Sequence, residues 1–388
     1  MENPLTSPSV EQMRERGSLK WSAYGDALGL WVAESDFGTA PVVRATLQKW
    51  VGEDNLGYLP PWLTQEMAYA CAGFMQRHYG WTIDSANIKP VADVLAGLEV
   101  IVREFTRPGS PIVVPTPAYM PFLTLPNYLG RPVIEVPMVR DARQRWTHDL
   151  GEIQMALEAG AGLVLLCNPH NPLGRVFDRQ ELQDLCDVVA GYDARIFADE
   201  IHAPIRFGNH KHVPFASISE TAAQISITAT STSKAFNAPG LKAAQVLLTA
   251  ECDIEKWRNF GWFAEHGAGT LGVAAATSAY AEGDGWLEHF NRTLSANRDL
   301  LESLLETHLP QARYEAPEGT YLAWLDLQEY GPRERWAAWL RSRADVAAVD
   351  GTACGVIGAG HVRLNFATSP KVLATAFERL GSALASSG

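Results

Sequence analysis

Short apolar runs alternate with longer amphipathic stretches through the middle of the chain. The runs that predict strands are residues 112–114, 133–136, 162–167, 194–198, 224–229 and 244–248. The stretches between them predict helices at residues 119–128, 149–159 and 178–190, with Asp149 as a candidate N-terminal cap. Short strands that are apolar on both faces and separated by helices are typical of a mainly parallel sheet covered by helices on both sides.

The pattern changes after about Gly283. A long helical stretch at residues 286–307 precedes apolar runs at residues 321–325, 346–349 and 361–366. This arrangement predicts a smaller α+β lobe. We expect the segment through Ala40 to pack against this lobe or against a partner subunit. The predicted division is a large domain of residues 41–285 and a small domain of residues 1–40 and 286–388.

Composition narrows the classes of function. The 388 residues carry a formal net charge of −12, which disfavours binding to nucleic acid or to an anionic membrane surface. We find neither a signal peptide nor an apolar window of about 18 residues, so no membrane helix is expected. The five cysteines are scattered and form no C-x-x-C pair, which favours free thiols and a cytoplasmic location.

Three polar clusters directly follow predicted strands. They are residues 167–174 (CNPHNPLG), 198–202 (ADEIH) and 230–237 (TSTSKAFN). Ligands bind at the carboxyl ends of the strands in open α/β sheets, so these clusters should meet at one edge. No cluster of histidines and carboxylates has the spacing of a metal site, and we interpret His210 and His212 as a solvated loop pair. The glycine-rich stretch 355–360 precedes a strand, unlike a dinucleotide-binding loop.

The clusters belong to a set of motifs that extends over nearly the whole chain. These are WVAESDF from Trp31, GY from Gly57, PAYMPF from Pro117, NPHNPLG from Asn168, DEIH from Asp199, STSKAFNAPGLK from Ser231, GTYLAWLDL from Gly319 and GHVRLNFATS from Gly360. Together they resemble enzymes of the aspartate-aminotransferase fold (fold type I) that depend on pyridoxal 5'-phosphate (PLP). Within that fold they resemble the cystathionine β-lyase-like C–S lyases of the MalY/PatB type. The resemblance implies a large α/β domain with a mainly parallel seven-stranded sheet and a smaller α+β domain.

The resemblance assigns the central chemistry to two residues. Lys234 would bond covalently to the cofactor aldehyde and later act as the base at the substrate α-carbon. Asp199 would keep the pyridine nitrogen protonated, so that the ring can accept electrons. Without the resemblance, Lys234 could be a surface lysine and Asp199 a helix cap.

Three further residues would contact the cofactor ring. His202 stands where the wider fold usually has a tyrosine near the 3'-oxygen, and the C–S lyases have a histidine there. Asn171 would contact the same oxygen and also the substrate. Tyr119 would stack on the ring face. The alternatives are an ordinary buried histidine, a turn residue before Pro172 and a core tyrosine.

The resemblance places the cofactor phosphate at a helix N-terminus that contains Asp93 and Val94. A glycine is common in that loop and is absent here. Ser231, Ser233 and Lys242 could add donors, although Lys242 could equally be a solvated lysine. Tyr58 resembles the tyrosine that reaches the phosphate of the neighbouring subunit, which implies a homodimer with shared active sites.

Arg363 is the candidate clamp for the α-carboxylate of a small amino-acid substrate, because its planar fork binds carboxylate through two donors. It lies on a predicted strand, on the same side as His361 and Asn365. The strand pattern alone also allows a surface arginine.

The implied reaction is β-elimination from cystathionine or another S-substituted L-cysteine, which yields a thiol, pyruvate and ammonia. Two alternatives stay open: transamination or decarboxylation of an amino acid or cysteine S-conjugate, and a regulatory protein that binds PLP without turnover. Departures from the family pattern keep the substrate open. Glu34 and Ser35 stand where the family commonly has Asp and Met, and residues 350–355 replace a Pro-Gly turn.

Overall fold

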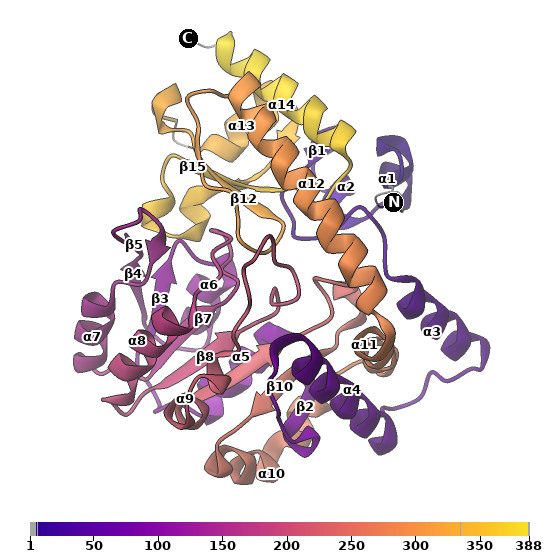
Figure 1. The fold of residues 1–388 in the computed structure, drawn as a ribbon, viewed down its shortest axis with the longest axis vertical. Coiled ribbons are helices and arrows are strands. Elements are labelled where there is room, and N and C mark those ends of the chain that lie inside the picture. Colours follow the sequence, from indigo (N-terminus) through magenta and orange to yellow (C-terminus); the bar gives the residue numbers. More distant parts are fainter. Residues whose placement is uncertain (1–4, 6, 334, 387–388) are drawn as a thin grey trace.

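The apolar runs in the middle of the chain form one seven-stranded sheet with the order β2-β10-β9-β8-β7-β3-β4 (Figure 1). We describe a computed structural model that covers residues 5, 7–333 and 335–386; the remaining positions, which belong to the predicted small domain, lie outside the described residues. The strands are β2 (Ile88–Val91), β3 (Ile112–Thr116), β4 (Val133–Pro137), β7 (Leu163–Cys167), β8 (Arg195–Asp199), β9 (Ser226–Thr230) and β10 (Ala244–Leu248).

Only β10 runs against the other strands of this sheet, so the predicted mainly parallel seven-stranded sheet is confirmed. Two details differ from the prediction. Strand β2 was not predicted, because it is short and contains Pro90. Gln224 and Ile225 end a helix instead of beginning β9, since Ser219 caps that helix through the amide of Ala222.

Helices cover both faces of this sheet. Alternate residues of a strand point to opposite faces. Ile112 and Val114 of β3 therefore pack in a cluster with α5, α6 and α10, whereas Val113 packs in the cluster with α7, α8 and α9. The bounds are α5 (Val94–Glu104), α6 (Met120–Tyr128), α7 (Leu150–Glu158), α8 (Arg179–Ala190), α9 (Glu220–Ile225) and α10 (Glu251–Glu265).

Acidic caps set the start of α7 and α8. Asp149 accepts a hydrogen bond from the Glu152 amide at 3.1 Å, which confirms it as the cap of α7. Asp178 accepts from the amide of Glu181 at 2.9 Å and begins α8 with a reciprocal capping box.

The C-terminal part builds a second, four-stranded antiparallel sheet with the order β11-β12-β15-β14, above the large sheet in Figure 1. Its strands are β11 (Arg313–Tyr314), β12 (Leu322–Asp326), β14 (Val349–Asp350) and β15 (His361–Asn365). The single strand predicted at residues 346–349 was wrong. The chain changes partner at Ala348, so β13 (Val346–Ala347) pairs with β1 (Leu28–Gly29) and β14 pairs with β15.

We predicted that the segment through Ala40 packs against the C-terminal part or a partner subunit, and residues 28–30 do pack against the C-terminal part. Leu28 pairs with Val346 in a parallel register, and the Asn365 amide donates to the Leu30 carbonyl at 2.8 Å. The remaining helices are α1 (Val10–Arg16), α2 (Leu19–Ser22), α3 (Pro41–Gly52), α4 (Pro61–Tyr79), α11 (Thr270–Glu282), α12 (Asp284–His308), α13 (Trp336–Ala344) and α14 (Pro370–Ala385). Short β5 (Val139–Arg140) and β6 (Trp146–Thr147) form a separate ribbon.

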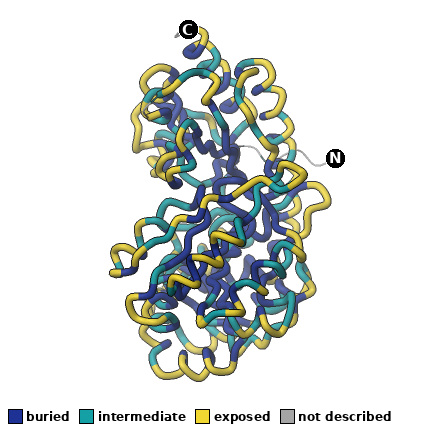
Figure 2. Tube along the Cα trace, turned by 90° about the vertical axis from the view of Figure 1, so that its left-hand side faces the viewer, coloured by how far each residue is buried: buried dark blue, intermediate teal, exposed yellow. Residues whose placement is uncertain are grey.

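Buried residues line the interior of both sheets, and exposed residues gather on the outer helices and loops (Figure 2). The carboxyl ends of β7, β8 and β9 lie between the large sheet and the C-terminal sheet that carries Arg363. Within the described part of the chain, no helix has both the length and the apolar character that spanning a bilayer requires.

Candidate active site

The three polar clusters predicted from the sequence lie side by side at one sheet edge. Cys167, the last residue of β7, is directly opposite Asp199, the last residue of β8. Asp199 is in turn opposite Ala229 near the end of β9. The parallel register therefore brings NPHNPLG, DEIH and STSKAFN together, as the sequence predicted.

Lys234 follows β9 and is half-buried. Its Nζ donates a hydrogen bond to the Ala33 carbonyl at 3.1 Å. Burial, with the Arg363 charge next, lowers the pKa of Lys234 to about 8, and the Asp199 carboxylate partly opposes this. A substantial share of the amine is thus neutral near neutral pH and can act as a nucleophile or base.

Asp199 has only 4% of its surface exposed, and its Oδ1 accepts the Ile201 amide at 3.1 Å. Burial raises the pKa of Asp199 to about 7, against the effect of that amide and of Lys234. Within the described residues no cation lies within ion-pair distance of this carboxylate. The site therefore holds a buried acid that a cationic ring nitrogen would satisfy.

Arg363 is 2% exposed, which excludes the surface-arginine alternative. Its Nη1 donates to Asn171 Oδ1 at 3.0 Å, and its Nη2 donates to the Trp31 carbonyl at 2.9 Å. Its Nε has no partner, and none of the described carboxylates pairs with the guanidinium. Burial lowers the pKa of Arg363. Because the ordinary pKa of an arginine is very high, the guanidinium still stays charged. A buried cation without an anion suits a carboxylate ligand.

His202 lies in the turn after β8, with its ring edge toward Tyr321 at a centroid distance of 6.0 Å. Burial, then the charges of Lys234 and Arg363, hold the pKa of His202 well below its usual value, so the ring is neutral. Its Nδ1 is buried without a hydrogen-bond partner. This nitrogen can therefore bind a ligand atom.

Tyr119 immediately precedes α6 and packs its ring edge-on against Phe122, with centroids 5.5 Å apart. Burial and the Asp199 charge raise the pKa of Tyr119, so its hydroxyl stays protonated. The influence of Asp199 on this phenol puts Tyr119 at the same sheet edge.

The candidate phosphate residues meet at the start of α5. Asp93 caps this helix by accepting the Ala96 amide at 2.8 Å, and its Oδ2 binds Lys242 Nζ at 2.7 Å. Burial alone would raise the pKa of Asp93, but the hydrogen bonds from Lys242 and Ala96 outweigh it and lower the pKa. Val94 is the first helical residue.

Ser231 and Ser233 lie beside each other in the loop before Lys234. The Ser231 hydroxyl donates to the Ala243 carbonyl at 2.8 Å and accepts the Ser233 amide at 3.1 Å. The hydroxyl proton of Ser231 thus goes to the Ala243 carbonyl in this structure, and a contact of Ser231 or Ser233 with phosphate stays a prediction.

Tyr58 does not join the cluster around Lys234 within one chain. Its side chain is 89% exposed and stacks on His266 at 5.9 Å. It borders an open cavity of about 1230 Å³, whose lining also includes Leu56, Leu241 and Trp262.

Sequence reasoning missed several groups that shape the site. The carbonyls of Trp31 and Ala33 bind Arg363 and Lys234, and Tyr321 Oη donates to the same Ala33 carbonyl at 2.9 Å. Trp31, Ala33 and Tyr321 lie in the WVAESDF and GTYLAWLDL motifs, which marked the two segments as important. The motifs did not reveal the hydrogen bonds, because a backbone carbonyl that accepts one can belong to any residue type.

The interpretation of His212 as a solvated loop residue was wrong. Its Nε2 lies 3.0 Å from Glu200 Oε2, and both side chains are buried. The Tyr79 ring packs against the His212 ring with centroids 5.0 Å apart, and the Phe215 amide donates to Glu200 Oε1 at 2.7 Å. His210 stays exposed, and no group of three or more potential metal ligands occurs among the described residues.

Comparison with known proteins places this geometry in a family. Residues 26–380 match the family Aminotransferase class I and II. The chain is 40% identical to the cystathionine beta-lyase of Corynebacterium glutamicum, over 97% of this chain and 99% of that protein. It is 31% identical to the cystathionine beta-lyase PatB of Bacillus subtilis, over 95% and 96% of the two chains.

A solved structure agrees with these relatives. The PLP-bound C–S lyase of Staphylococcus hominis superimposes with a TM-score of 0.90 at 27% identity, covering 99% of this chain and 98% of that one. The fold is therefore the aspartate-aminotransferase-like fold that the sequence motifs implied. By the match over most of its length, the chain belongs to the aminotransferase class I and II family.

Proposed function

We propose that this protein is a PLP-dependent C–S β-lyase that converts an S-substituted L-cysteine to a thiol, pyruvate and ammonia. The observation that carries the proposal is the convergence of three groups at one sheet edge: the Lys234 amine, the buried Asp199 carboxylate and the buried, anion-free Arg363. The relatives named cystathionine beta-lyase support cystathionine as a substrate.

The residues present fit the cofactor ring. Asp199 lacks a cationic partner and would bind the protonated pyridine nitrogen. His202 has an unpartnered Nδ1 and, with Asn171, would face the 3'-oxygen. Tyr119 would lie against the ring face, and Lys234 would hold the aldehyde carbon covalently.

The phosphate would sit at the N-terminus of α5. The amides there point out of the helix and bind anions. Asp93 and Val94 would contribute backbone donors, Ser233 an additional polar group, and Lys242 the positive charge that its ion pair with Asp93 holds in place. Ser231 would support this loop through its bond to Ala243.

The chain's own residues explain the sequence of steps. Arg363 binds the substrate α-carboxylate, with Asn171 fixing the guanidinium. Neutral Lys234 then takes the proton from the α-carbon. When bound, PLP supplies the electron sink that makes this proton acidic. The bond between the β-carbon and sulfur breaks, and the Lys234 ammonium can return its proton to the departing thiolate. The remaining aminoacrylate takes up water and yields pyruvate and ammonia.

A homodimer would complete the site. The surface around Tyr58 includes exposed Leu56 and Trp262, and it is continuous with the phosphate region because the Gly269 amide donates to the Lys242 carbonyl at 2.9 Å. A second copy could cover this surface and present its own Tyr58 to the phosphate. All five cysteines are free, which supports a cytoplasmic location.

The large, mainly parallel sheet and the four-stranded antiparallel sheet support a division into two domains. We propose that residues 41–285 form the PLP-binding domain, and that residues 1–40 and 286–388 form the small domain that carries Arg363.

A product assay tests the proposal. The purified, PLP-loaded protein is mixed with cystathionine and a panel of S-alkyl cysteines, and pyruvate, free thiol and absorbance are followed together. Equal amounts of pyruvate and thiol are the expected result. A spectral change without either product would instead indicate transamination or decarboxylation. Binding without any turnover would indicate a regulatory protein.

A further inference from the structure

Hydrogen bonds from several side chains to the backbone carbonyls of Ala33 and Glu34 hold this segment in place. The Ala33 carbonyl accepts from Lys234 and Tyr321, and the Glu34 carbonyl accepts from Asn365 Nδ2 at 2.7 Å. Lys20 Nζ also donates to the Glu34 carbonyl, at 3.1 Å. The backbone of this segment is thus held rigidly beside the reactive lysine.

The next two residues of this segment, Ser35 and Asp36, also have hydrogen-bond partners. Asn237 exchanges two hydrogen bonds with the backbone of Ser35, of 2.9 and 2.8 Å. Asp36 accepts from Lys20 at 2.9 Å and from Trp21 Nε1 at 2.8 Å. The cation nearest in sequence, Lys20, is therefore neutralised by Asp36.

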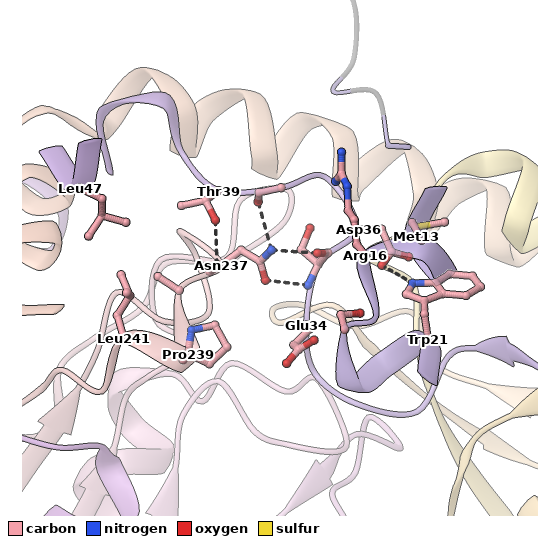
Figure 3. Close-up of a pocket in the computed structure, with 15 residues that line it drawn as sticks. Met13, Arg16, Trp21, Glu34, Asp36, Thr39, Leu47, Asn237, Pro239 and Leu241 are labelled. Carbon is pink, nitrogen blue, oxygen red and sulfur yellow. Dashed lines mark hydrogen bonds between the residues drawn. The ribbon is translucent and has the colours of Figure 1, made fainter. Parts of the chain in front are cut away.

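The Glu34 carboxylate, unlike these groups, has no charged partner among the described residues. It is half-buried, and within the described part of the chain no cation lies within ion-pair distance of it. Figure 3 shows its side chain extending below the hydrogen bonds of Asn237. It lines a cavity of about 400 Å³ together with Arg16, Asp36 and Leu241, and no ion pair joins Arg16 to Glu34.

The charge of Glu34 is felt at the reacting centre. The pKa of Lys234 is lowered by burial and by Arg363, and Glu34 is one of the two carboxylates that oppose this shift. The segment also touches both ends of the substrate site, since the Trp31 carbonyl holds Arg363 and the Ala33 carbonyl holds Lys234. A substituent on the substrate sulfur would extend past this segment.

We propose that Glu34 is a specificity residue that binds a positively charged amino group on the leaving thiol. This inference rests on the proposed lyase function and deepens it. The preferred substrates would be S-substituted L-cysteines with an ammonium group a few bonds beyond sulfur, such as cystathionine. Neutral S-alkyl cysteines would be poorer substrates.

The assignment follows from the charges in the site. Arg363 would be neutralised by the substrate carboxylate and Asp199 by the cofactor ring, so Glu34 is the one of these three charged groups that would be left without a partner. A half-buried carboxylate gains most from a cation that it can both attract and hydrogen-bond.

Two substrates of nearly equal size isolate the charge. S-(2-aminoethyl)-L-cysteine and S-propyl-L-cysteine differ at one terminal atom, which is an ammonium in the first and a methyl in the second. We expect the PLP-loaded wild type to favour the aminoethyl compound in kcat/KM by about tenfold, mostly through KM. Glu34→Gln should remove this preference, and Glu15→Gln, on the exposed face of α1, should keep it.

A reversal of charge sharpens the test. Glu34→Lys should favour S-(2-carboxyethyl)-L-cysteine over the aminoethyl compound. If Glu34→Gln keeps the tenfold preference, the proposal is wrong. If it lowers kcat equally for both substrates, Glu34 acts on Lys234 and not on the substituent, which also overturns the proposal.

Binding measurements separate this inference from the lyase function. Both compounds are titrated calorimetrically into PLP-loaded Lys234→Ala, with and without Glu34→Gln. A dissociation constant about tenfold lower for the aminoethyl compound, lost in the double variant, would support the ammonium site even if the wild type releases no thiol. Equal binding of the two compounds would contradict it.

Discussion

At the scale of single residues, burial sets the protonation states that the chemistry needs. Lys234 and Asp199 face the same edge, and burial moves their pKa values toward each other, to about 8 and about 7. Burial also keeps His202 neutral. The same desolvation therefore favours a free amine at Lys234 and a neutral imidazole at His202, and it makes Asp199 a buried carboxylate that a cationic ring nitrogen would stabilise.

Capture of PLP by the cofactor-free protein should depend on pH through Lys234. Only the neutral amine attacks the aldehyde, so the capture rate should rise with pH and level off above about 8. Between pH 7 and pH 9 the rise should be roughly tenfold. Stopped-flow absorbance measures this rate.

The Asp199→Asn variant serves as the control for this profile. It removes one of the anions that raise the pKa of Lys234, so the midpoint should move to lower pH. A midpoint near the ordinary lysine value, about 10.4, would contradict the buried environment of Lys234.

Arg363→Lys should mainly weaken substrate binding. Lysine keeps the charge but loses the planar fork, so KM should rise about tenfold while kcat changes little. Steady-state kinetics with cystathionine measure both values. Arg44→Lys, on exposed α3, should leave KM unchanged. An unchanged KM in Arg363→Lys would remove Arg363 from the substrate site.

At the scale of elements, the turn after β8 depends on a buried, hydrogen-bonded pair of side chains, Glu200 and His212. Glu200 accepts from the Phe215 amide at 2.7 Å and lies 3.0 Å from His212 Nε2. These contacts tie the loop of residues 201–215 back to the sheet edge that holds Asp199 and His202. Several kcal/mol of stability can rest on such a pair, because removing one partner leaves the other buried alone.

Glu200→Ala should lower the free energy of unfolding by about 3 kcal/mol. Urea denaturation followed by circular dichroism measures the change. Glu255→Ala, at an exposed position of α10, is the matched control and should have an effect near zero. A loss no larger than the control would show that the pair contributes nothing net.

At the scale of the whole molecule, the exposed apolar surface around Tyr58 is the feature that a monomer does not explain. Trp262 is 66% exposed beside it, and the neighbouring Phe263 is exposed as well. Apolar side chains gathered on one surface commonly mark a protein interface. This surface borders the region where the phosphate would bind.

Sedimentation equilibrium should give a mass of twice the 42.4 kDa chain. Trp262→Glu should shift the protein toward the monomer and weaken PLP binding, since the partner would no longer bring its Tyr58. Met155→Glu, at an exposed site on α7, should remain dimeric. A wild-type monomer that binds PLP tightly would contradict the shared site.

Many residues of the candidate site could be predicted from the sequence, because they directly follow predicted strands. A buried run that ends in a polar cluster places that cluster at the sheet edge, whatever the loops do. Asn171, Asp199 and Lys234 were found in this way. The hydrogen bond from Ser231 to the Ala243 carbonyl was not predicted, because a backbone acceptor in a distant loop leaves no local pattern, and the role of Ser231 as a phosphate donor stays a prediction.

Local sequence patterns predicted six of the seven strands of the large sheet, four helices to within two residues of their ends, and the candidate residues for the chemistry. These features are local: a cap such as Asp149 acts over three residues, and a strand that is buried on both faces is a continuous apolar run in the sequence. The contacts that hold these groups in place arise from the tertiary fold. Lys234 meets Ala33 across 201 residues, and Arg363 meets Trp31 across 332. Such contacts depend on packing between distant segments, which no local pattern encodes. For the same reason, the burial of His212 and the unpaired charge of Glu34 emerged only in the folded chain.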